Sequence, residues 1–194
     1  MGNVRLRRLQ NDHSELQKLP RLTADRVQFT TEGDPPTRYI VTYKVKGLVG
    51  REPDKLREQT RFDVEFQLTD EYPRMAPVVT ARQKVWHPNF WRNQKVCIDA
   101  EHFAAGQSLT DLVIRVGEMI QYQVINLGDP ANRDAAEWAA KNEHLFPIDK
   151  ETLQCGAPPE DDDIVIRFGR DDDDAGGEDD FQVSIGSITR GEDT

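Results

Sequence analysis

Cysteines and long hydrophobic runs are scarce in this sequence, and each scarcity excludes a class of protein. Only two cysteines, Cys97 and Cys155, occur in 194 residues, which is too few for a disulfide framework. No stretch approaches the roughly 20 apolar residues that span a bilayer, and the N-terminus has no apolar run suited to a signal peptide. We therefore expect a cytoplasmic protein with free thiols and no membrane partner.

Net charge is scarce outside the end of the chain. Residues 160–194 hold 13 acidic residues and three arginines, a net charge of −10, so the remaining 159 residues carry 22 charges of each sign. A neutral folded part and an acidic end argue against nucleic acid as a partner. No cysteine or histidine pair stands at zinc-ligand spacing from Cys97, and we expect neither a metal nor a cofactor.

The residues that are present indicate one folded domain followed by a tail. Hydrophobic residues make up 37% of the chain and include eight Phe and three Trp, which supports a packed core. Pro158-Pro159 marks a boundary, beyond which aspartate clusters dominate. We predict a folded domain over residues 1–157 and a partly disordered acidic tail over residues 158–194.

Hydrophobic periodicity predicts a helix first and then strands. Leucines at helical spacing predict an amphipathic helix over residues 3–19 with a basic face, which Pro20 ends. Residues 62–68 alternate between apolar and polar side chains, as in a half-buried strand. Further strands are expected at residues 27–29, 38–45 and 78–81, with a turn at 33–36 and a charged loop at 47–60.

The second half of the chain predicts a long loop and then helices. No period persists over residues 85–106, and a loop of this length inside a compact domain suggests function. Ser108 is a suitable N-cap for a helix that extends to residue 127 and stops at Gly128. A second helical stretch covers residues 135–145. The predicted fold class is α+β, with an N-terminal helix, a four-stranded antiparallel sheet, an active-site loop and C-terminal helices.

Cys97 lies in that loop, and three interpretations of it remain open. A lone cysteine is commonly a small buried hydrophobe. Here, however, Val96 and Ile98 flank it while the neighbouring side chains are polar, which leaves the thiol at the edge of water, where a reactive cysteine is found. A Cys-His hydrolase would need one of the four histidines as its base, and none has a local signature of that role.

The motifs around Cys97 resemble those of the ubiquitin-conjugating enzymes. His87-Pro88-Asn89 stands for the family's HPN tripeptide, and Cys97 follows Asn89 by eight residues, the distance to the family's thioester-forming cysteine. Tyr72-Pro73 with Ala76-Pro77 resembles the YPxxPP turn with one proline replaced by alanine. Residues 108–110 stand where the family has ALT, and Asp129-Pro130 resembles its DP corner. The resemblance covers roughly residues 3–145.

The resemblance implies acyl transfer through a thioester. Cys97 would accept a ubiquitin-like modifier protein from an activating enzyme and pass it to an amine of a target protein. Asn89 would donate its amide to the developing oxyanion, or would hold the loop that carries the cysteine. His87 and Pro88 would shape the active site from beneath. A catalytically inactive, ubiquitin-binding variant of the same fold is a further alternative.

Other residue roles are implied by position. Asp134, five residues after Asp129, stands where family members carry an acidic residue that positions the incoming lysine, although it also suits a helix N-terminus. Asp99 is a second acidic candidate for a catalytic role. The arginines of the first helix stand where the family docks the activating enzyme: Arg5, Arg7 and Arg8.

The sequence also departs from the family pattern. The tryptophan and Ser-Pro that ligases contact are missing from residues 105–110, and the stretch from residue 108 to residue 129 is about five residues longer than usual. Such divergence around a retained motif suggests a distant branch. The conjugating enzymes of bacterial ubiquitin-like operons, which are associated with antiviral defence, are one candidate.

Overall fold

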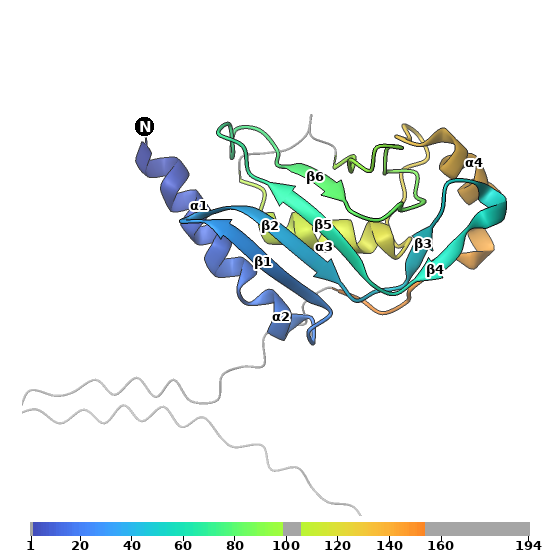
Figure 1. Ribbon diagram of the computed structural model, residues 1–194, viewed down its shortest axis with the longest axis horizontal. Helices are drawn as coiled ribbons and strands as arrows, with labels where there is room; N and C mark the ends of the chain where they lie inside the picture. Colours follow the sequence, from blue (N-terminus) through green and yellow to red (C-terminus); the bar gives the residue numbers. More distant parts are fainter. Residues whose placement is uncertain (1, 99–105, 154–194) are drawn as a thin grey trace, which may run out of the picture. The chain divides into compact units, whose positions relative to one another are not determined.

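The computed structural model describes residues 2–98 and 106–153, and these form an α+β domain (Figure 1). Two helices, α1 (Gly2–Leu16) and α2 (Leu19–Leu22), precede the strands. The main sheet is antiparallel with the order β1-β2-β5-β6, and its strands are Val27–Gly33, Pro36–Tyr43, Phe62–Gln67 and Val78–Ala81. Helices α3 (Leu109–Ile120) and α4 (Arg133–Lys141) follow. The predicted N-terminal helix, four-stranded sheet and C-terminal helices are confirmed.

The core lies between one face of the sheet and α3, which runs behind the sheet in Figure 1. Strand β5 shows the predicted alternation, since Phe62, Val64 and Phe66 are fully buried and the residues between them are not. Helix α3 begins at the predicted N-cap, where the hydroxyl of Ser108 accepts hydrogen bonds from two backbone N–H groups. Its apolar stripe includes Leu112, which is also fully buried.

The end of the first helix differs from the prediction. Helix α1 stops at Leu16, and Pro20 lies in the first turn of α2 instead of ending the first helix. A proline is accepted there because the first N–H groups of a helix have no partner within it. Leu16 and Leu19 are both fully buried, so the residues on either side of the break belong to the core.

Helix α3 ends at Ile120 and not at residue 127, because contacts of Tyr122 with distant segments hold the following residues in a non-helical conformation. Tyr122 adopts a φ of 60°, in the left-handed region that interrupts a helix. Its ring stacks on Phe146 at 4.5 Å, and its hydroxyl donates to the carbonyl of Trp86. Helix α4 starts at Arg133 rather than residue 135 and ends at Lys141, after which Glu143–Leu145 forms a short 3-10 helix, η3.

The region predicted as a charged loop contains a second, two-stranded sheet. Strands β3 (Gly47–Val49) and β4 (Arg57–Gln59) pair in antiparallel fashion around the 3-10 helix η1 (Pro53–Lys55). Each strand is only three residues long, β3 has no polar side chain and β4 has only polar ones, so neither shows an alternation from which a strand could be predicted. This small sheet lies near α4 in Figure 1.

Several predictions concern residues outside the described ranges. These are the catalytic candidate Asp99, the thiol Cys155 and the domain boundary between residues 157 and 158. Within residues 2–98 and 106–153, no helix has the length and apolar character needed to cross a membrane.

Candidate active site

The eight-residue spacing between Asn89 and Cys97 corresponds to a small hairpin. The N–H of Cys97 donates to the carbonyl of Asn89 at 2.8 Å, and Phe90 forms an antiparallel bridge with Val96. The N–H of Trp91 donates to the carbonyl of Lys95, which closes the tip. Residues 89 and 97 therefore lie opposite each other, so this spacing fixes the distance between the two candidate catalytic residues.

Cys97 borders a groove of about 420 Å³ between the hairpin, α3 and the segment after α3. Its side chain is neither fully buried nor fully exposed, as the sequence predicted for a thiol at the edge of water. Side chains from all three segments line this Cys97 groove, including Asn89, Cys97, Arg115, Met119, Asn126 and Asp129. The partly exposed thiol therefore lies at the border of this groove.

Asn89 fastens one wall of the groove. Its side chain is 4% exposed, and its Oδ1 accepts a hydrogen bond from the N–H of Asn126 at 3.0 Å. The amide oxygen is thus used within the protein, whereas Nδ2 donates no hydrogen bond to any residue that the structure describes. Pro88 makes a similar connection, because its carbonyl accepts a hydrogen bond from the N–H of Asn132 at 3.0 Å. Both residues tie the segment between α3 and α4 to the hairpin.

His87 lies beneath the hairpin and away from the Cys97 groove. The ring is fully buried and meets Phe90 and Tyr122 edge-on, with centroids 5.6 and 4.6 Å apart. Its Nδ1 accepts a hydrogen bond from the N–H of Asn89 at 3.0 Å, which orients the backbone of the motif. Burial lowers the pKa of His87 to about 3, against a smaller opposing effect of the Val124 backbone. A neutral, buried imidazole supports the loop and is no general base for Cys97.

The two aspartates near the end of this region have different surroundings. Asp134 is in the first turn of α4, where its carboxylate pairs with the guanidinium of Arg92, and it is not among the residues that line the Cys97 groove. Asp129 does line that groove. The sequence noted Asp129 only as part of the Asp-Pro corner, so its carboxylate was missed.

Arg115 was missed as well. It lies one helical turn before Met119 on α3, and both side chains line the Cys97 groove. A single arginine at the border of an otherwise apolar stripe was the available signal. Within the described ranges, no three His, Cys, Asp or Glu side chains come together as metal ligands would.

The three arginines of α1 do not form one free surface. Arg8 packs over the ring of Tyr72 at 5.5 Å, and its Nε donates to the carboxylate of Asp12 at 2.7 Å. Arg5 donates to the carbonyl of Thr69 at 3.1 Å. Of the three arginines, only Arg7 is exposed, and the other two are partly buried. Arg5 and Arg8 also anchor α1 to the segment between β5 and β6, and the docking of a partner on the three arginines stays a prediction.

Comparisons with known proteins agree with this geometry. A family model described as ubiquitin-conjugating enzyme matches residues 8–152. The NEDD8-conjugating enzyme UBE2F of Homo sapiens is 28% identical over 94 residues, which cover 44% of this chain and 50% of that protein. Ubiquitin-conjugating enzyme E2 13 of Saccharomyces cerevisiae is 30% identical over 84 residues, 42% of this chain and 54% of that protein. The chain therefore spans about half the length of these relatives.

A solved structure supports the fold. The protein titled "Novel Ubiquitin-Conjugating Enzyme" superposes with a TM-score of 0.53 over 73% of this chain and 88% of that chain, at 20% sequence identity. At this identity the likeness concerns the fold, and it matches the arrangement of helices and sheet described above.

Proposed function

The chain belongs to the ubiquitin-conjugating enzyme family, and from that premise we propose that Cys97 carries a ubiquitin-like protein as a thioester and passes it to an amine of a target. The observation that carries the proposal is the hairpin that sets Cys97 opposite Asn89 at the edge of an open groove. The partners are then a modifier, its activating enzyme and a target protein. Relatives that act on ubiquitin or on NEDD8 make both modifiers candidates.

The chemistry consists of two acyl transfers. The Cys97 thiolate attacks the carbonyl of the thioester that links the modifier to its activating enzyme, and the activating enzyme's thiolate leaves. A target amine then attacks the new thioester, Cys97 leaves as a thiolate, and the amine loses a proton as the amide forms. The acyl group arrives already activated, so the site needs no histidine base beside the cysteine, in agreement with the position of His87.

Roles for the groove residues follow from their positions. Asn89 supports the reaction through Nδ2 as an oxyanion donor, through Oδ1 as the anchor of the groove wall, or through both. Asp129 has the better placement for a carboxylate that receives the incoming lysine, because it lines the groove whereas Asp134 pairs with Arg92. Asp134 and Asp99 keep the predicted catalytic roles as the alternatives to be tested.

The experiment is a charging assay with purified protein, modifier, activating enzyme and ATP. We expect the wild-type protein to form an adduct that a thiol reductant removes. Cys97→Ser should form either no adduct or an oxyester that resists the reductant. Cys155→Ser is the matched control and should charge normally. A reducible adduct that persists in Cys97→Ser would contradict the assignment. Cleavage of a modifier conjugate without ATP would identify a hydrolase, and binding of the modifier without any adduct would identify an inactive variant.

A further inference from the structure

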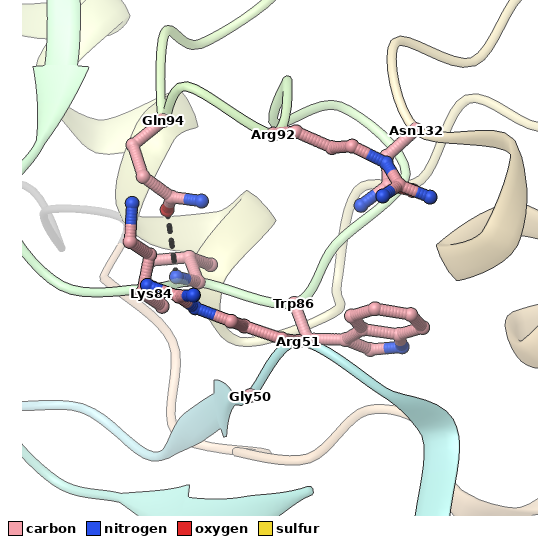
Figure 2. Close-up of a pocket in the computed structure, with 8 residues that line it drawn as sticks. Gly50, Arg51, Lys84, Trp86, Arg92, Gln94 and Asn132 are labelled. Carbon is pink, nitrogen blue, oxygen red and sulfur yellow. Dashed lines mark hydrogen bonds between the residues drawn. The ribbon is translucent and has the colours of Figure 1, made fainter.

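A second hollow borders the tip of the hairpin, shares no lining residue with the Cys97 groove, and is lined by positive charge. This basic pocket of about 310 Å³ is lined by, among others, Gly50, Arg51, Lys84, Trp86, Arg92 and Gln94 (Figure 2). The backbone brings its parts together, because the N–H of Gly50 donates to the carbonyl of Lys84 at 3.0 Å and the N–H of Trp86 donates to the carbonyl of Leu48 at 2.9 Å. Strand β3 thereby holds Arg51 and Lys84 at one rim.

The cations of the basic pocket differ in their pairing. Arg92 at the opposite rim is paired with Asp134. Arg51 and Lys84 are exposed, and within the described ranges neither forms an ion pair. Two like charges held side by side repel each other. An anion bound between them would relieve that repulsion, so the rim is complementary to an oxyanion.

Gln94 adds a fixed neutral donor. The side chain is only 7% exposed, and its Oε1 accepts a hydrogen bond from the N–H of Val85 at 2.7 Å. This bond determines the orientation of the amide group, so that Nε2 points into the hollow in Figure 2. Nε2 has one long contact, 3.5 Å to the carbonyl of Trp91, which leaves it donor capacity for a ligand.

Another hollow of about 310 Å³ shares Gly50, Arg51 and Lys84 with the basic pocket. Its lining adds Lys55 and Arg57. The combined surface is therefore extended and suits a length of polypeptide better than one small ion. A nucleic-acid backbone fits less well, because the small sheet and α4 also present Glu52, Glu58 and Asp134, which would repel a continuous run of phosphates.

We propose that the basic pocket binds an anionic side chain of a partner polypeptide, a carboxylate or a phosphoryl group, through Arg51, Lys84 and the amide of Gln94. Guanidinium and ammonium groups make charge-assisted hydrogen bonds to both kinds of oxyanion. The site is separate from the acyl-transfer groove. Binding there would bring an acidic region of a partner beside the active site without occupying it.

The test uses the full chain without an activating enzyme and two fluorescein-labelled probes. One is a short peptide of alternating aspartate and glycine, and the other has phosphoserine in place of aspartate. We expect one or both to bind in an anisotropy titration and to move the Trp86 indole N–H signal in NMR spectra, which Trp86→Phe assigns. The tighter probe identifies which oxyanion the site prefers.

Matched variants locate the site. Arg51→Gln combined with Lys84→Gln should weaken binding by about tenfold or more, since two charge-assisted contacts are lost. Lys44→Gln combined with Arg61→Gln removes the same charge at exposed positions outside both hollows and should leave binding within about twofold. Failure of the wild-type protein to bind either probe would overturn the proposal. Equal losses in the two double variants, or an indole signal that does not move, would do the same.

Discussion

The two sides of residues 86–98 differ in charge although they belong to one short segment. On the side of the Cys97 groove, the charged neighbours are Arg115 and Asp129, one of each sign. On the other side, Arg51, Lys84 and Arg92 make the basic pocket. Between the two sides, His87 and Phe90 are fully buried and support the segment from below. A rigid hairpin can therefore present two independent surfaces, and substitutions on one should spare the other.

The largest separable effect is expected at Asn89, on the groove side. Asn89→Ala should still accept the modifier but discharge it to lysine about 100-fold more slowly, the value of an oxyanion donor. Binding of the anionic peptide probes should not change. Single-turnover discharge of the preformed thioester measures the first effect, and the anisotropy titration measures the second. A loss of peptide binding equal to the loss of discharge would show that the two sides are coupled.

Asn89→Asp then distinguishes the two roles of the amide. An aspartate keeps an oxygen that can accept the N–H of Asn126, but it has no Nδ2 donor. If Asn89 acts as the oxyanion donor, this variant should discharge as slowly as Asn89→Ala. Recovery of most of the wild-type rate would instead assign Asn89 to holding the groove wall.

The next effect concerns the buried support, which both sides share. Because burial lowers the pKa of His87 from 6.5 to about 3, the unfolded chain binds a proton at pH values where the folded chain does not. The contribution of neutral His87 to the free energy of unfolding is present above pH 6.5, and it is lost progressively as the pH falls from 6.5 toward 3. The loss should reach about 2 kcal/mol at pH 5.

Urea unfolding at pH 7 and pH 5 measures this loss. His87→Gln keeps an acceptor for the N–H of Asn89 but cannot titrate, so it should be less stable at pH 7 and should lose about 2 kcal/mol less than the wild type between the two pH values. Thioester discharge and peptide binding should both weaken in this variant. An identical pH dependence in the two proteins would show that His87 has the same pKa in the folded and the unfolded chain.

The sequence predicted these regions unevenly, for physical reasons. The alternation of apolar and polar residues was sufficient to predict β5, and the HPN motif with its spacing to the cysteine was sufficient to select Asn89 and Cys97. Both signals depend only on residues close together in the sequence. The end of α3 depends on Tyr122, whose contacts with Trp86 and Phe146 come from distant segments. No local pattern reports such contacts.

The charged residues of α1 show the same limitation. The sequence grouped Arg5, Arg7 and Arg8 as one basic face, whereas Arg8 turns inward to Asp12 and Tyr72. An arginine can extend along a helix surface and bury its stem, so its position in the sequence does not determine which way its charge faces. The basic pocket was missed for the converse reason, since Arg51 and Lys84 are 33 residues apart and meet only through the pairing of β3 with residues 84–86.

The smallest expected effects separate Asp129, which lines the Cys97 groove, from Asp134, which pairs with Arg92 of the basic pocket. Asp134→Asn removes an exposed ion pair with Arg92, so stability should change by less than about 1 kcal/mol and discharge should be unchanged. It also frees Arg92 for a ligand, and the anionic peptide probes should bind up to about fivefold more tightly.

Asp129→Asn should slow discharge by up to about fivefold and leave peptide binding unchanged, because its carboxylate lines the Cys97 groove. The two variants carry the same change of charge, so net charge cannot explain opposite patterns. Slower discharge in Asp134→Asn with normal discharge in Asp129→Asn would return the lysine-positioning role to Asp134 and would require Arg92 to release it during the reaction.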